Sequence, residues 1–129
     1  MEAAMSLLLR LLTVDESLFA SVLEHAEDAT VGCVDLMGRS LLHYAAMLGK
    51  ASALALLLSR PVEGDLRDDR GDTALHLAAG NGERQAVELL LAHGVDRSLQ
   101  DEDGRTALDL AHSEAQRYFQ TEAVHALAL

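Results

Sequence analysis

A pattern that recurs every 33 residues constrains the fold of this chain more than any other feature. The copies begin at Asp35, Asp68 and Asp101, and each has Gly three residues later and Ser or Thr two residues after that. A fixed period of this size is typical of solenoids, in which each copy buries its apolar face only against its neighbours. The chain is therefore expected to stack repeated units rather than to fold around one central core.

The central copies resemble ankyrin repeats, a family whose signature is a Thr-Pro-Leu-His-x-Ala core. The segment that starts at Thr73 reads Thr-Ala-Leu-His-Leu-Ala, and the segment that starts at Ser40 reads Ser-Leu-Leu-His-Tyr-Ala. The proline of the motif is absent from every copy, and the match is strong over residues 35–112 and weak at both ends. The resemblance implies an all-α ankyrin-repeat solenoid of stacked antiparallel helix pairs joined by short hairpin-like loops.

The period divides residues 1–129 into one domain of four repeats, at about 1–34, 35–67, 68–100 and 101–129. The first and last repeats are degenerate, as is typical of caps that lack a neighbour on one side. In the first repeat we expect helices from Ala3 to Thr13 and from Asp15 to Glu27, the second with Leu18, Phe19 and Leu23 on one apolar face.

Composition and charge narrow the class of partner. Half of the residues are apolar but only two Tyr, two Phe and no Trp occur, so Leu and Ala must build the core. The net charge of −11 argues against nucleic acid and anionic membranes as partners and favours basic protein surfaces.

The single cysteine, Cys33, excludes an internal disulfide and favours a reducing compartment. No apolar run reaches the roughly 18–20 residues that a membrane span needs. Glu2 and Arg10 do not suit an export signal in the Leu-rich start of the chain. We therefore expect a cytoplasmic protein.

No pattern of catalytic or metal-binding residues stands out. Of the six histidines, two belong to the repeat motif and the others lie far apart, without metal-ligand spacing. The Gly80-Asn81-Gly82 turn lacks the lysine of a phosphate-binding loop. The sequence predicts no enzyme activity, no cofactor and no metal site.

The resemblance also assigns roles within the motif. In the family, the Ser/Thr caps the first helix of a repeat and its hydroxyl pairs with the His ring, which implies the pairs Ser40 with His43 and Thr73 with His76. Asp109 stands in the His position of the last repeat and leaves the role of Thr106 open.

The family binds partners through its hairpin tips and the inner face of its first helices, which line a concave groove. Positions that match this surface here fall into an apolar N-terminal half and an acidic C-terminal half. They are Thr13, Val14, Leu36, Met37, Arg39, Met47, Leu48, Asp69, Arg70, Asp72, Gly80, Asn81, Glu102, Asp103, Arg105, Ser113 and Glu114. The hypothesis is a protein partner whose segment carries apolar anchors followed by Arg or Lys.

Three alternatives stay open at this stage. Met47 and Leu48 are core if the 24–37 loop covers them, and the acidic half is only a solvated face if no partner uses it. The apolar half joins two copies if the chain is a self-assembling structural unit rather than an adaptor or inhibitor. A monomer is favoured and a homodimer is possible.

Overall fold

The structure is a computed structural model that describes residues 2–111, with side chains from Met5 onward. The backbone forms α-helices joined by loops, and one isolated β-bridge, between Val34 and Ser40, lies among the described residues. The helices are α1 (Glu2–Val14), α2 (Glu16–His25), α3 (Asp28–Val31), α4 (Leu41–Met47), α5 (Ala51–Leu58), α6 (Ala74–Gly80) and α7 (Arg84–His93), and residues 107–111 are also helical.

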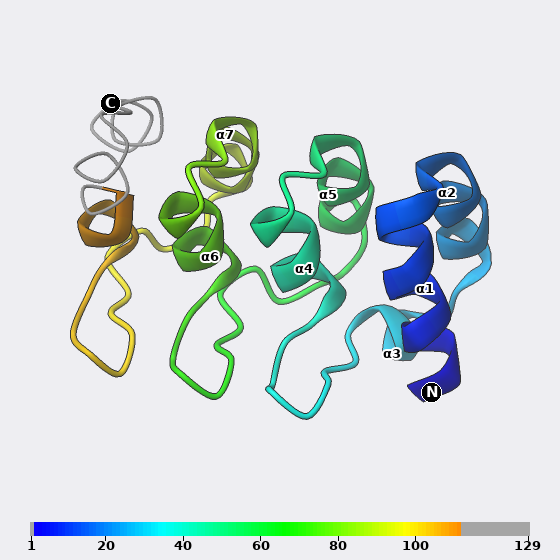
Figure 1. The fold of residues 1–129 in the computed structure, drawn as a ribbon, viewed down its shortest axis with the longest axis horizontal. Helices are drawn as coiled ribbons and strands as arrows, with labels where there is room; N and C mark the ends of the chain where they lie inside the picture. The colour runs from blue at the N-terminus through cyan, green and yellow to red at the C-terminus, as the bar shows by residue number, and fades with distance from the viewer. Residues whose placement is uncertain (1, 112–129) are drawn as a thin grey trace.

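The helices stack in two rows, which confirms the all-α solenoid. Helices α1, α4 and α6 lie side by side in the inner row, and α2, α5 and α7 form the outer row (Figure 1). Each inner helix packs against the outer helix that follows it in sequence. The loops that precede α4, α6 and the 107–111 helix project from one side of the stack, at the bottom of Figure 1.

Leucine and alanine build the core, as the composition predicts. Leu54, Leu57 and Leu90 of the outer row are completely buried. Ala46 and Ala78 are also inaccessible to solvent and lie on α4 and α6, which contact each other. Small side chains at these positions let neighbouring helices approach closely.

The first helix of each central pair starts at the residue that the motif indicates. The side chains of Ser40 and Thr73 accept hydrogen bonds from the backbone N–H of His43 and His76, at 3.4 and 3.3 Å. These bonds satisfy donors that a helix N-terminus otherwise leaves without partners. At the other end, Gly94 terminates α7 in the left-handed conformation.

The first repeat differs from expectation at its second helix. Helix α2 ends at His25 rather than Glu27, and a further short helix, α3, occupies what was expected to be a loop. Phe19 is buried as predicted, whereas Leu18 is 49% exposed and does not belong to the buried face.

A long-range contact explains the early end of α2. The guanidinium of Arg60, which follows α5, donates to the carbonyls of Leu23 at 2.8 Å and Ala26 at 2.7 Å. It also pairs with the Asp28 carboxylate at 2.6 Å. Arg60 thus satisfies the last carbonyls of α2 and fixes the start of α3, and no local sequence pattern carries that information.

Candidate functional site

The three hairpin-like loops share one internal scaffold. The Asp35 carboxylate accepts hydrogen bonds from the backbone N–H groups of Met37 at 2.9 Å and Arg39 at 3.0 Å. Asp68 and Asp101 each accept the equivalent pair, from residues two and four positions further on, at 2.9–3.0 Å. The repeated aspartate therefore holds the loop in shape rather than facing a partner.

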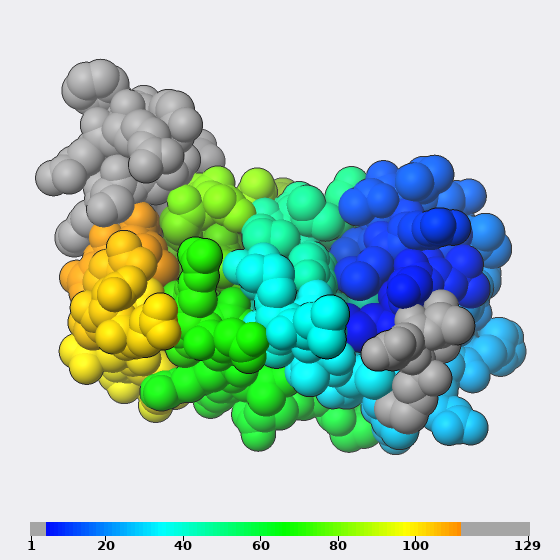
Figure 2. All heavy atoms as spheres, turned by 60° about the horizontal axis from the view of Figure 1, so that its bottom comes forward, coloured from blue at the N-terminus to red at the C-terminus, as the bar shows by residue number. Residues whose placement is uncertain are grey.

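Neighbouring loops are joined to one another at their tips. The N–H of Asp69 donates to the Met37 carbonyl at 2.9 Å, and the N–H of Glu102 donates to the Arg70 carbonyl at 3.0 Å. Figure 2, which brings this side forward, shows cyan, green and yellow segments in sequence across one face. The tips therefore form one continuous ridge along the stack.

The motif histidines connect successive repeats. Nδ1 of His43 lies 3.1 Å from the Ser40 N–H and 3.0 Å from its hydroxyl, and Nε2 lies 3.1 Å from the Asp72 carbonyl oxygen. Because a carbonyl can only accept, the proton of the neutral ring belongs on Nε2. His76 repeats this geometry, with Nε2 at 2.9 Å from the Arg105 carbonyl. Burial lowers the pKa of His43, which keeps its ring neutral.

In the last repeat, Asp109 takes the place of the histidine in the cap. Its carboxylate accepts from the Thr106 N–H at 2.9 Å, and the Asp109 N–H donates to the Thr106 hydroxyl at 3.3 Å. Thr106 therefore keeps its capping role, with a carboxylate in place of the imidazole.

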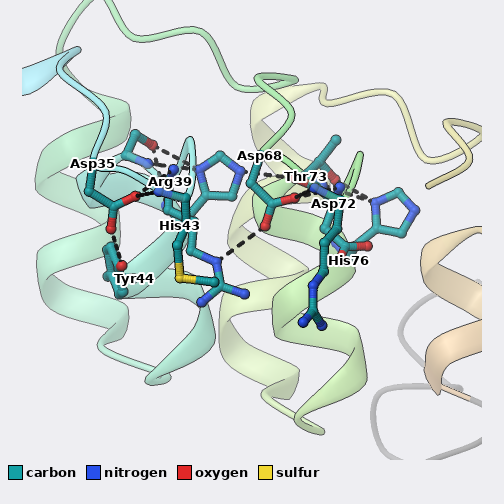
Figure 3. Close-up of polar contacts among 11 residues, drawn as sticks. Asp35, Arg39, His43, Tyr44, Asp68, Asp72, Thr73 and His76 are labelled. Carbon is teal, nitrogen blue, oxygen red and sulfur yellow. Dashed lines mark hydrogen bonds and ion pairs between the residues drawn. The ribbon is translucent and has the colours of Figure 1, made fainter. Parts of the chain in front are cut away.

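Two of the predicted groove residues are engaged within the stack. Arg39 Nε lies 3.2 Å from Asp68 Oδ2 of the next loop (Figure 3), and these side chains are 16% and 2% exposed. Asp72 stands at the same position one period later, and its Oδ1 is buried without a hydrogen-bond partner among the described residues. Burial raises the pKa of the Asp72 carboxyl to about 7, with further contributions from hydrogen bonding to Asp101 and from the charge of Asp68.

A partly buried contact lies beneath the first tip. The Tyr44 hydroxyl of α4 donates to the Asp35 carboxylate (Figure 3). Although burial alone would raise it, the pKa of Asp35 lies below its ordinary value because Tyr44 and the backbone N–H groups of Arg39 and Met37 stabilise the charged form. Asp35 thus stays ionised and holds the base of the first tip.

The predicted apolar half is exposed but forms two separate groups. Leu36 and Met37 lie at the first tip and are 96% and 45% exposed. Val14 and Leu48 lie at the far ends of α1 and α4, at 82% and 41%, and Met47 is partly buried. Helix α4, whose seven residues span about 10 Å, lies between the two groups.

A cleft adjoins the first tip, where α1 meets the loop that precedes α4. It has a volume of about 300 Å³, and its lining includes Leu9, Cys33, Val34 and Leu36. Sequence reasoning placed Leu36 on the binding surface but missed Leu9, Cys33 and Val34. No pattern could have found them, because the cleft exists only when α1 packs beside a loop that lies more than 20 residues further along the chain.

The acidic half occupies the second and third tips. Asp69, Arg70, Glu102 and Asp103 are exposed there. Exposed Arg105 pairs with Asp103 at 3.1 Å and with Asp101 at 3.4 Å, which reduces its availability to a partner.

One further predicted position lies away from these tips. Asn81 is exposed at the end of α6 and donates to the Met47 carbonyl at 3.1 Å. The predictions for Ser113 and Glu114 lie outside the described residues.

Comparison with known proteins decides the family. A family model described as ankyrin repeats (3 copies) matches residues 14–96 and 42–128. The chain belongs to the ankyrin-repeat family. Ankyrin repeats are generally protein–protein interaction modules and are typically non-enzymatic. No curated protein matches the sequence.

Within residues 2–111, no helix combines the length and the apolar character that crossing a bilayer requires.

Proposed function

We propose that this ankyrin-repeat chain is a non-enzymatic module that binds a segment of another protein along its ridge of hairpin tips. The observation that carries the proposal is the exposure of Leu36, 96% accessible at a tip and beside a cleft. When a partner covers a leucine that an ordered loop exposes to water, the free energy of the system falls, and this favours binding.

The N-terminal end of the ridge provides the apolar anchor site. Leu36, Met37 and Val34 are each at least 45% exposed, and Leu36 and Val34 line the 300 Å³ cleft. Covering Leu36 completely contributes about 1.5–3 kcal/mol, and covering the half-exposed Met37 or Val34 contributes about half as much.

The second and third tips provide the electrostatic half of the site. Asp69, Glu102 and Asp103 are exposed carboxylates on loops that follow one another along the ridge. Arg or Lys side chains placed after the apolar anchor of a bound segment would face them. Such contacts mainly raise the association rate and fix the orientation of the segment.

The proposed role is that of an adaptor or an inhibitor that masks a partner surface. A reducing, cytoplasmic setting fits the free Cys33 at the cleft. Within the described residues, both ring nitrogens of the motif histidines are engaged in the stack, which supports a binding rather than a catalytic role.

A peptide-library selection against the full chain tests the proposal directly. We expect enrichment of segments with an apolar anchor followed by Arg or Lys. Leu36→Glu should abolish binding of the selected peptides, and Asp69→Asn combined with Glu102→Gln should slow association and flatten its salt dependence. Leu18→Glu is the matched control, because Leu18 is 49% exposed but lies on outer helix α2. Equal loss of binding in the Leu36 and Leu18 variants would refute the site.

The second candidate function is self-assembly through the same apolar tip. The exposure of Leu36 favours it equally, because a symmetric dimer would bury each tip against its copy. Sedimentation equilibrium at high protein concentration separates the two functions. A dimer that Leu36→Glu dissociates supports assembly, whereas a monomer at every concentration rules it out.

A further inference from the structure

At the junction of the last two described loops, one position of the repeat carries a residue of opposite charge to that in the other copies. The residue four places after the repeated aspartate is Arg39 in the second repeat and Arg105 in the fourth, but Asp72 in the third. Arg39 uses this position to pair with Asp68 of the next loop at 3.2 Å. Asp72 instead presents a carboxyl to Asp101, where an arginine would have made an ion pair.

The two carboxyl groups meet at a partly desolvated junction. Side-chain oxygens of Asp72 and Asp101 lie within 4.8 Å of each other, and the Asp101 side chain is only 2% exposed. Asp72 Oδ1 is buried without a partner among the described residues. Two carboxylates this close in a partly desolvated site cannot both ionise at low cost.

Among the described residues, Asp68 and Arg105 are the charged groups that act on this pair. Asp68 lies on the same loop as Asp72, and Arg105 pairs with Asp101 at 3.4 Å from an exposed side chain. His43 of α4 donates to the backbone carbonyl of Asp72, so it does not neutralise the carboxyl. Arg39 pairs with Asp68, so the carboxyl groups of Asp72 and Asp101 have one exposed cation, Arg105, between them.

A metal ion does not fit the cluster. A ring nitrogen of His76 also lies within 4.8 Å of the two carboxyl groups. However, its Nδ1 accepts from Thr73 at 3.2 Å and its Nε2 donates to the Arg105 carbonyl at 2.9 Å. The imidazole therefore has no lone pair free for a metal, and the occupant that remains is a proton.

We propose that Asp72 and Asp101 share one proton at the junction between the third and fourth repeats, and that its release loosens the 101–111 segment from the stack. The proton comes from solvent, resides on the Asp72 carboxyl and returns to solvent when the pH rises. The junction is thus a pH-sensitive element at the acidic end of the ridge, independent of any partner.

The pKa shifts agree with this assignment. Burial, hydrogen bonding with Asp101 and the charge of Asp68 raise the pKa of Asp72 to about 7. Although burial alone would raise it, the pKa of Asp101 lies below its ordinary value, because the Arg105 N–H, the Asp72 carboxyl and the Asp103 N–H stabilise its charged form. The proton therefore resides on Asp72 and the charge on Asp101.

The sign of the pH effect follows by linkage. Between pH 3.8, the ordinary pKa of an aspartate, and about pH 7, the folded chain holds a proton that the unfolded chain has released. The contribution of Asp72 to stability is therefore present at low pH and is lost as the pH rises through about 7. His43, whose pKa is lowered, acts in the opposite direction below pH 6.5, so the wild type must be compared with a variant that lacks only the Asp72 carboxyl.

The experiment combines a titration with hydrogen exchange on the full chain. Carbon-13 NMR of the Asp72 carboxyl should give a midpoint near 7 rather than 3.8. Exchange of the Glu102 and Arg105 amides, corrected for the intrinsic rate, should become about tenfold faster between pH 5 and pH 8. Because Asp72 is partly exposed, solvent screens its charge and keeps this change below the full effect of a pKa near 7.

Three variants isolate the shared proton. Asp72→Asn should remove the pH dependence of exchange, and Asp72→Arg should slow exchange at pH 8 by supplying the pair that Arg39 makes in the second repeat. Asp69→Asn is the matched control, an exposed carboxyl on the same loop, and should leave the pH dependence unchanged. A midpoint near 4 for Asp72, or the same pH dependence in Asp72→Asn, overturns the proposal. If Asp72→Asn does not fold, the wild-type titration alone decides.

Discussion

Gly71→Ala tests whether contact between loops, rather than loop conformation alone, holds the stack together. Gly71 has φ +78°, a left-handed conformation that costs an alanine about 1–2 kcal/mol. A Cβ atom at this position would also lie 2.9 Å from the backbone nitrogen of Glu102. That approach forces the next loop away and breaks the 3.0 Å bond from the Glu102 N–H to the Arg70 carbonyl. Loss of this bond adds about 1 kcal/mol, so the total cost is about 2–3 kcal/mol.

Gly104→Ala is the matched control for the conformational part of this cost. Gly104 has φ +74°, and no heavy atom among the described residues lies within 4 Å of a Cβ built there. Its substitution should therefore cost only about 1–2 kcal/mol. Urea unfolding followed by circular dichroism gives both free energies, with an unchanged slope showing that the transitions are comparable. Equal costs for the two variants would refute the reasoning, because the contact between loops would then contribute nothing.

Three further substitutions test other parts of the stack. Ala78→Leu should overpack the contact between inner helices and lower the urea-unfolding free energy by about 1–3 kcal/mol; no loss would mean that the helices are not in close contact. Arg60→Met should cost about 2–3 kcal/mol and speed amide exchange around Ala26, because the carbonyls of Leu23 and Ala26 lose a charged donor. Burial lowers the pKa of His43, so its contribution to stability is present above pH 6.5 and is lost as the pH falls below that value; His43→Gln should flatten this part of the stability profile, and an unchanged profile would contradict the assignment.

The sequence predicts the fold because the second, third and fourth repeats carry the same local motif. The residue spacing from Asp68 to His76 fixes a loop, a cap and a helix start, and the hydrogen bonds that shape them join residues at most four positions apart. The links between repeats follow as well, because His43 reaches the third repeat through a position that the motif already specifies. Local chemistry repeated at a constant period is therefore enough to predict a solenoid.

The first repeat is where this reasoning fails, since its contacts do not repeat. The interaction of Arg60 with Leu23 and Ala26 spans more than 30 residues and has no counterpart one period later among the described contacts. It determines where α2 ends and allows α3 to form, and together these elements displace the loop that the period alone would predict. Helix ends that depend on long-range contacts are not predictable from local sequence.

The alignment of the repeats predicted where the residues of the candidate site lie on the fold. It did not predict what their side chains contact. Arg39 and Asp72 were assigned to one groove surface, yet Arg39 bonds to the next loop and Asp72 faces a second carboxyl there. The same alignment does reveal that Asp72 is unusual, because an Asp cannot make the contact that Arg39 makes one repeat earlier. A residue that departs from the motif where two repeats meet is therefore a better first target for mutation than an exposed charge at a tip. Only the residue at the junction changes the contact between the repeats.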